Sequence, residues 1–289
     1  MICIFNHPKQ IGVKKLLKTT YKLLLPALLL TITASAQKLP KIQAASVLAP
    51  AVVKVDGKTT EWNNRFQAFN RTTEVYYTLA NSATKLYLIV QSNEKRIIRK
   101  IIANGVTLTI NTGSVDQKDG LAVTFPAYTK TERPPSYNLG NPYLEVKDTV
   151  QNNKMADSTL AVFNADLSSR LKIIGVVGDP NAAPDSTLSI FNTDGYKAAG
   201  NFTHADKAFV FTYELAIPLS AIKFAADKPG AFKYTLQVNG IQGEVQIDGN
   251  NQMSYLAGDG SRVYVGYAGP NNLGFANPTN FSGEYTLAK

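Results

Sequence analysis

The chain contains very little cysteine, histidine or tryptophan, and these shortages exclude several kinds of chemistry. Its 289 residues include one cysteine (Cys3), two histidines and one tryptophan. Cys3 lies in an N-terminal segment that we expect to be removed, so the mature chain has no cysteine for disulfides, thiol catalysis or metal binding. The remaining histidine, His204, is accompanied by no Gly-x-Ser-x-Gly motif and no phosphate-binding loop. The fold must therefore be held by its hydrophobic core, which a chain of this length can bury.

Residues 1–36 have the pattern of an export signal. Five lysines precede the apolar stretch 23–33, and Ala34-Ser35-Ala36 supplies small residues for cleavage after Ala36. The apolar stretch is shorter than the roughly 20 residues that cross a bilayer, which argues against a retained anchor. We therefore expect a secreted, periplasmic or cell-surface protein that has no membrane span after the signal is cleaved.

The net charge of the chain is small once the signal is removed. The whole chain carries 30 basic and 21 acidic residues, a net charge of +9. Five lysines and no acids precede residue 37, which leaves 25 basic and 21 acidic residues and a net charge of +4. The densest basic cluster, formed by Lys95, Arg96, Arg99 and Lys100, is interpreted as a solvated face. No basic stripe indicates a nucleic-acid partner.

The mature chain is expected to be a linker at residues 37–50 followed by one β-rich domain at residues 51–289. Short apolar or alternating segments bounded by turn residues predict the strands. These segments are residues 51–55, 72–80, 85–91, 106–110, 120–125, 158–163, 171–177, 187–191, 208–217, 231–241, 262–267 and 285–287. The clearest is 208–217, where large apolar residues alternate with a second face that carries Glu214.

One segment has helical rather than strand periodicity. Ile97, Ile98, Ile101 and Ile102 recur at helical spacing within residues 94–103, and a glycine follows as a stop signal. Many short strands and one short helix predict an all-β fold. We expect a single antiparallel β-sandwich of jelly-roll or immunoglobulin-like architecture.

The only tryptophan, Trp62, closes the sequence that follows the first predicted strand. Asp56-Gly57 predicts a tight turn, and Trp62 is expected to anchor one end of the core, because an indole packs a large apolar area. The alternative is a platform on which a sugar ring stacks.

Several local patterns resemble carbohydrate-binding module family 9 and its relatives, and together they span about residues 50–289. They are Asp56-Gly57 with Glu61-Trp62 after a strand, Tyr213 to Leu219 as a late strand that ends in Ile-Pro, the helix-to-strand passage from Ile97 to Ile110, and the closing Glu284 to Lys289.

The resemblance implies a secreted β-sandwich of bacterial type that binds carbohydrate. In the best-understood members, tryptophans stack on a terminal sugar and calcium ions support the structure. A single tryptophan excludes a two-tryptophan clamp here, so tyrosines would have to supply the stacking faces.

The long connection at residues 127–142 is the main candidate for a sugar site, because aromatic rings and polar donors occur together there. The candidate ligand-binding residues are Tyr128, Arg133, Tyr137, Asn138, Tyr143 and Glu214. Tyr255, Tyr264 and Tyr267 form a second candidate group. The alternatives are an ordered loop whose tyrosines cover the core, and a Glu214 that pairs across the sheet.

Calcium is a candidate cofactor, because several acidic side chains lie in loops. The candidate ligands are Asp116, Asp119, Asp248 and Asp259, although none has an EF-hand spacing and such residues also mark turns.

The sequence favours a secreted, non-catalytic carbohydrate-binding domain that takes part in polysaccharide recognition or breakdown, with plant or other polysaccharides as partners. One alternative is an envelope β-sandwich that makes structural or protein contacts. Lesser alternatives are a component of a hydrolase acting on O-glycosyl bonds, and a haem-binding sandwich using Met155, Met253 or His204.

Overall fold

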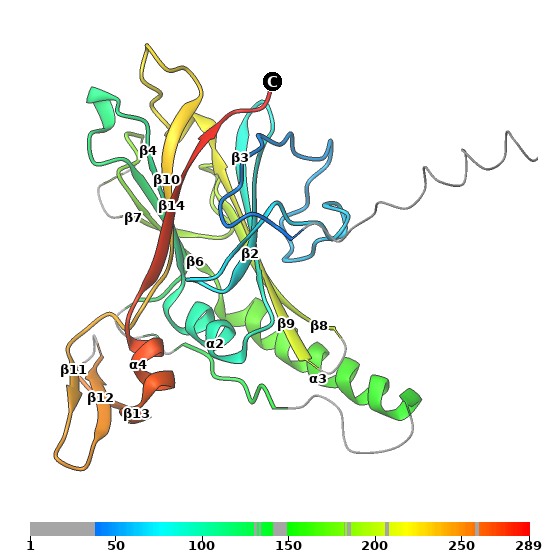
Figure 1. Ribbon diagram of the computed structural model, residues 1–289, viewed down its shortest axis with the longest axis vertical. Helices are drawn as coiled ribbons and strands as arrows, with labels where there is room; N and C mark the ends of the chain where they lie inside the picture. The colour runs from blue at the N-terminus through cyan, green and yellow to red at the C-terminus, as the bar shows by residue number, and fades with distance from the viewer. Residues whose placement is uncertain are drawn as a thin grey trace, which may run out of the picture. The chain divides into compact units, whose positions relative to one another are not determined.

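The computed structural model describes residues 38–129, 132, 134–140, 149–181, 183, 186–205, 208–257 and 260–289. The expected signal segment lies outside these residues. The described chain is mostly β, and its ladders are antiparallel, as the sequence predicts. Within the described residues, the strands form two larger sheets and a small sheet, and three α-helices accompany them (Figure 1).

The strands form three sheets within the described residues. The five-stranded sheet has the order β1 (Ala68–Asn70), β2 (Val75–Asn81), β3 (Lys85–Ser92), β9 (Ala208–Pro218), β8 (Lys197–Ala205). The six-stranded sheet has the order β14 (Thr279–Thr286), β10 (Ala231–Val238), β4 (Val106–Asn111), β5 (Leu121–Ala127), β6 (Ile173–Val177), β7 (Ser186–Ser189). The small sheet joins β11 (Val245–Ile247), β12 (Gln252–Leu256) and β13 (Arg262–Tyr267).

Side chains of the two larger sheets meet in one hydrophobic cluster. The hydroxyls of Tyr77 on β2 and Tyr234 on β10 are 2.9 Å apart and share a hydrogen bond. The rings of Phe125 on β5 and Tyr213 on β9 lie 5.7 Å apart, centroid to centroid. These contacts between sheets explain why every second residue of β10 is buried, and the strand expected at 231–241 ends at Val238.

Strand β9 is buried on both faces, whereas the sequence predicted one inward and one outward face. A second, smaller cluster covers its outer side, formed by Trp62, Ala80 and Ile89 with partly buried side chains from residues 47–66. Glu214 on that side is therefore only 2% exposed. The alternation of residues along one strand cannot predict that residues distant in the sequence will bury its outer face.

Helix α2 (Lys95–Asn104) confirms the predicted helix, and its four isoleucines are buried. Gly105 ends it at a φ of 79°, a conformation that other residues rarely adopt. A Cβ there would lie 2.4 Å from the carbonyl oxygen of Pro126, so the close packing against β5 also requires glycine.

The prediction of only one helix is wrong. Helices α3 (Thr149–Arg170) and α4 (Pro270–Ala276) are also present, and the expected strand 158–163 lies inside α3. Leu160 and Leu167, seven residues apart, are buried while Val162 is 67% exposed, which is helical rather than strand spacing. Helix α3 lies along β8 because the Asn164 amide bonds both the N–H and the carbonyl of Phe202, at 2.7 and 2.9 Å.

The expected strand 51–55 is also wrong, because no strand is assigned before β1 in the described residues. The N–H of Lys54 donates to Glu61 Oε1 at 3.0 Å instead of joining a ladder.

The segment expected to be a linker lies against β2 and β14. The Gln43 side chain accepts from the Leu79 N–H and donates to the Leu79 carbonyl, both at 2.8 Å. Ser46 Oγ donates to the carbonyl of Thr286, and the Tyr285 hydroxyl donates to the carbonyl of Val47 at 3.1 Å. The start and the end of the described chain are therefore fastened to each other.

Candidate functional site

Two adjoining hollows in the described residues together form a cleft. It lies between the end of α2, the described residues of 127–139 (127–129, 132 and 134–139) and strands β12 and β13. The halves have volumes of about 340 and 380 Å³ and share Ala103, Pro134 and Tyr255 in their linings. Each volume falls in the range of ligand sites, roughly 300–1,000 Å³.

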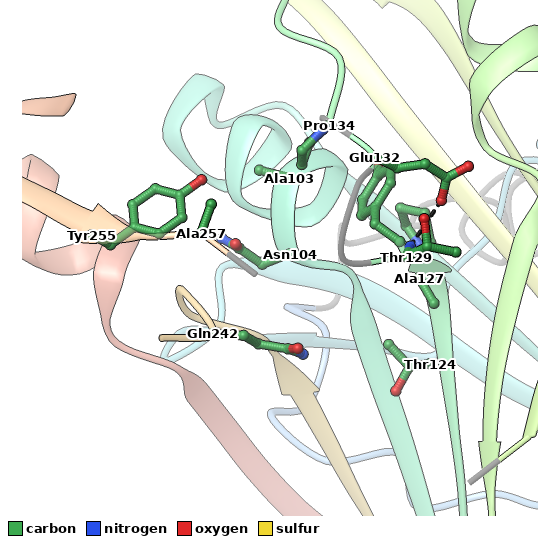
Figure 2. Close-up of a pocket in the computed structure, with 12 residues that line it drawn as sticks. Ala103, Asn104, Thr124, Ala127, Thr129, Glu132, Pro134, Gln242, Tyr255 and Ala257 are labelled. Atoms are coloured by element: carbon green, nitrogen blue, oxygen red, sulfur yellow. Dashed lines mark hydrogen bonds between the residues drawn. The ribbon is translucent and has the colours of Figure 1, made fainter. Parts of the chain in front are cut away.

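The first half, here called the polar half, is lined by amide, hydroxyl and carboxylate groups as well as two tyrosines. Its lining residues are Ala103, Asn104, Thr124, Pro126, Ala127, Tyr128, Thr129, Glu132, Pro134, Gln242, Tyr255 and Ala257. In Figure 2, Tyr255 and Ala257 come from the β12 side, Thr129 and Glu132 stand opposite, and Asn104 lies between them.

Asn104 is the last residue of α2, and its side chain lacks a partner. Its Nδ2 is buried and has no acceptor within hydrogen-bond distance among the described residues. Its carbonyl accepts from Asn239 Nδ2 at 3.0 Å, which fixes the backbone. The amide torsion is soft, so rotation about it would turn either the nitrogen or the oxygen toward the polar half.

The second half, here called the apolar half, is lined mainly by aliphatic and aromatic side chains. Its lining residues are Arg99, Ile102, Ala103, Pro134, Pro135, Ser136, Tyr137, Leu139, Tyr255, Val263, Tyr264, Val265 and Phe275. Arg99 is the one charged side chain among the described residues of this lining. Tyr264 is 56% exposed, so part of its ring is open to solvent.

Tyr128, a predicted site residue, lines the polar half but has its hydroxyl engaged. The hydroxyl donates to the carbonyl of Ile102 at 2.5 Å, which ties the loop to α2. Burial, with smaller contributions from Tyr137 and Glu132, raises the pKa of Tyr128, so the phenol keeps its proton. It can therefore offer a ligand its ring rather than its proton.

Tyr137 fastens the loop to α3. It is 9% exposed, and its ring lies 4.8 Å from that of Phe163 and 5.3 Å from that of Phe202. Its hydroxyl donates to Asp166 Oδ2 at 2.8 Å. Burial first, and then this hydrogen bond, raises the pKa of Tyr137, while the same bond lowers the pKa of Asp166. Tyr137 holds the edge of the apolar half in place.

Asn138 is exposed, and its Oδ1 accepts from the N–H of Gly140 at 3.1 Å, so it shapes a turn and does not line either half. Arg133 and Tyr143 lie outside the described residues. Of the second candidate group, Tyr255 lines the polar half with Tyr128, and Tyr255 and Tyr264 line the apolar half with Tyr137. Tyr267 lines neither half.

Glu214 does not line either half of the cleft; its carboxylate is buried and surrounded by hydrogen-bond donors. Its Oε1 accepts from Trp62 Nε1 at 2.9 Å. Its Oε2 accepts from the backbone N–H groups of Asp56 and Gly57, at 2.9 and 2.8 Å. Burial raises its pKa to about 7 against the opposing effect of these hydrogen bonds. The carboxylate thus holds the turn and the indole together, and it faces them rather than solvent.

Lys100 joins α2 to the connection between α4 and β14. The sequence placed it on a solvated face, but it is 1% exposed, and that interpretation is wrong for this residue. Its Nζ donates to the carbonyl of Asn277 and to Thr279 Oγ1. Burial, helped by the charge of Arg96, lowers the pKa of Lys100 to about 8. The pattern of four basic residues gave no sign of this, since the helix turns one of them inward.

The candidate calcium ligands do not form a site in the described chain. Asp116 and Asp119 are exposed, and Asp248 Oδ1 accepts from the N–H groups of Asn250 and Gln252 in a turn. Asp259 lies outside the described residues. No group of three or more His, Cys, Asp or Glu side chains is close enough to hold a metal ion in the part of the chain that is described.

Comparisons with known proteins add no assignment. No protein-family model matches the chain, and no curated protein matches it significantly. None of the described helices has the length and apolar character that a bilayer crossing needs.

Proposed function

We propose that this chain is a secreted, non-catalytic carbohydrate-binding protein whose ligand occupies the cleft beside α2. The observation that carries the proposal is the Asn104 amide, buried without an acceptor beside a cavity that Tyr128 and Tyr255 also line. A buried donor without a partner costs about 1–3 kcal/mol, and a sugar hydroxyl could relieve that cost.

The composition of the polar half suits a sugar. A pyranose has an apolar face that packs on aromatic rings and a rim of hydroxyls that both donate and accept. Gln242, Glu132 and Thr124 lie in the same lining as the tyrosines and complement such a rim. Their types cover both donors and acceptors, which is what orienting a polyol requires.

We further propose that the two larger sheets form a β-sandwich of the carbohydrate-binding-module kind. The hydrogen bond between Tyr77 and Tyr234 and the shared hydrophobic cluster support it. Two of the sequence patterns that resemble family 9 modules contact each other in this arrangement. Trp62, from the first pattern, donates a hydrogen bond to Glu214, from the late-strand pattern, on the five-stranded sheet.

The lining of the cleft supports binding rather than hydrolysis. Glycosidases generally use two carboxyl groups flanking the scissile bond. In the described lining of both halves, Glu132 is the one carboxylate, and its Oε2 accepts from the N–H of Thr129 at 2.8 Å.

The proposal is tested by titrating the mature chain, residues 37–289, with oligosaccharides from plant and bacterial polysaccharides in a calorimeter. Saturable binding that a competing sugar displaces supports it. Heats indistinguishable from dilution across the panel, from a chain whose circular dichroism is β-rich, would reject it.

A second candidate function, protein contact through the small sheet, is favoured by its exposed apolar side chains. Ile247, Leu256, Tyr264 and Tyr267 are 51%, 46%, 56% and 63% exposed. Capture of an envelope protein that is lost on changing Tyr267 and Leu256, with no glycan signal, would favour this candidate over sugar binding.

A further inference from the structure

The apolar half of the cleft has a property that sugar binding alone does not require. Among the described residues, its lining combines three aromatic rings that are at least partly exposed (Tyr255, Tyr264 and Phe275) with one cation, Arg99. No described carboxylate lies within ion-pair distance of Arg99, and no described acceptor takes a hydrogen bond from it. A guanidinium beside apolar surface and without an anion is a ready partner for a negatively charged ligand.

The neighbouring cations are placed differently. Arg96, one turn earlier on α2, is neutralised by an ion pair with Glu74. Lys95, Arg96 and Arg99 line a third hollow beside the apolar half, together with Glu94 as its acidic member. Arg99 belongs to the linings of both hollows, so it stands where they meet. With Arg96 paired to Glu74, Lys95 and Arg99 outnumber Glu94 among the described residues at this border, so its net charge is positive.

We propose that the apolar half, with Arg99 at its border, is a subsite for a sugar ring that carries a carboxylate, so that the preferred ligands are glycans containing uronic acid. This inference rests on the proposed function. A uronic acid presents an apolar ring face to Tyr264 or Tyr255 and a planar carboxylate to Arg99. The planar fork of arginine binds a carboxylate through two parallel hydrogen bonds, which a neutral hydroxymethyl group cannot match.

The polar half explains why the ligand would be a sugar rather than any organic acid. It adjoins the apolar half through Ala103, Pro134 and Tyr255, and it carries the Asn104 amide. A ligand that reaches from Arg99 into the polar half needs an acid at one place and hydroxyls at the next. Neighbouring residues of an acidic oligosaccharide have that order of groups.

The test compares oligomers of equal length by calorimetry on the mature chain: trigalacturonate, neutral galactotriose, a sulfated galactose trimer and triglutamate. We expect trigalacturonate to bind about tenfold more tightly than the neutral trimer, as one charge-assisted contact would give, and salt to weaken it. Arg99→Gln should remove that advantage, and Arg99→Lys should restore part of it. Arg65→Gln, at an exposed arginine that lines none of these hollows, is the control.

The other outcomes have distinct meanings. Equal affinity for the acidic and neutral trimers, with Arg99→Gln without effect, overturns the uronate subsite and leaves the proposed function standing. Equal or tighter binding of the sulfated trimer overturns the carboxylate assignment, and equal binding of triglutamate overturns the sugar. No binding of any trimer overturns the uronate subsite, while the proposed function is rejected only if the wider oligosaccharide panel is also silent.

Discussion

The indole Nε1 of Trp62 donates a 2.9 Å hydrogen bond to Oε1 of Glu214, a residue on the central strand β9. The other oxygen of the same carboxylate holds the turn at Asp56 and Gly57. One buried side chain therefore fastens the segment before β1 onto the outer face of the five-stranded sheet.

Replacing Glu214 with glutamine should destabilise the protein. Glutamine keeps the shape, but its NH₂ group would face N–H donors in either orientation, leaving at least one buried donor without an acceptor. Above pH 7, where the carboxyl is ionised, we expect a loss of about 1–3 kcal/mol in the free energy of unfolding, measured by urea denaturation. Glu244→Gln, at an exposed position, is the control and should change stability by no more than about 0.5 kcal/mol.

The raised pKa of Glu214 predicts how stability varies with pH. The carboxyl has a pKa of about 7 when folded and 4.5 as its ordinary value. Between these values the folded state binds more protons than the unfolded state, so the free energy of unfolding should fall as pH rises from 4.5 to 7. The upper limit of this contribution is about 3 kcal/mol. Unfolding curves of Glu214→Gln should lack this component, and an identical pH dependence in both proteins would contradict it.

Lys100 predicts the opposite trend in alkaline solution. Its pKa is lowered from 10.5 to about 8, so between these values the unfolded state binds more protons. The contribution of Lys100 to the free energy of unfolding should therefore rise from pH 8 to 10.5. Lys100→Met should remove this rise, as measured by thermal unfolding in a pH series. Lys95→Met, exposed on the same helix, should retain the behaviour of the unmodified chain.

Tyr255 and Tyr267 form a matched pair for the cleft. Both lie on the small sheet, but only Tyr255 lines the cavities. Tyr255→Ala should weaken glycan binding about tenfold or more, as expected for a lost stacking face, while Tyr267→Ala should not. Calorimetry measures both affinities. Equal losses in the two variants would place the site on the sheet surface instead of the cleft.

The Asn104 amide predicts a change that separates binding from stability. Asn104→Ala removes an unpartnered buried donor, so the free protein should be as stable or more stable, whereas glycan affinity should fall about tenfold. Calorimetry and thermal unfolding on the same sample test this. A less stable variant with unchanged affinity would show that Asn104 serves the fold alone.

Much of the fold could be predicted because short stretches of the sequence show which of their residues are buried. The alternation in 231–238 and the four isoleucines of α2 each report burial within a few residues. The sequence did not predict helix α3 because its buried residues, Ala156, Leu160 and Leu167, are spread over twelve positions, while the stretch 158–163 alone resembles a strand. A pattern sought over five or six residues cannot detect a buried face whose residues are spaced this widely.

The candidate site was predicted only in part, because three distant segments build it. Tyr128 and Tyr255 were recognised as aromatic residues in suitable surroundings, but their common cavity depends on tertiary packing. Asn104 carried one usable signal, an amide at a helix end just before a glycine. The hydrogen-bond partners of Glu214 could not be predicted, because the donors at residues 56, 57 and 62 are more than 150 positions away in the sequence.

The fastening of Ser46 and Val47 to the last strand has a consequence for how this domain could be displayed. Strand β14 begins at Thr279, beside the Lys100 contact, and ends at Thr286, beside Ser46. The end of the domain where residues 46 and 286 meet is thus a full strand length from the contact between α2 and Thr279 (Figure 1). A tether attached near either of these residues would leave the cleft at the opposite end of the domain from the point of attachment.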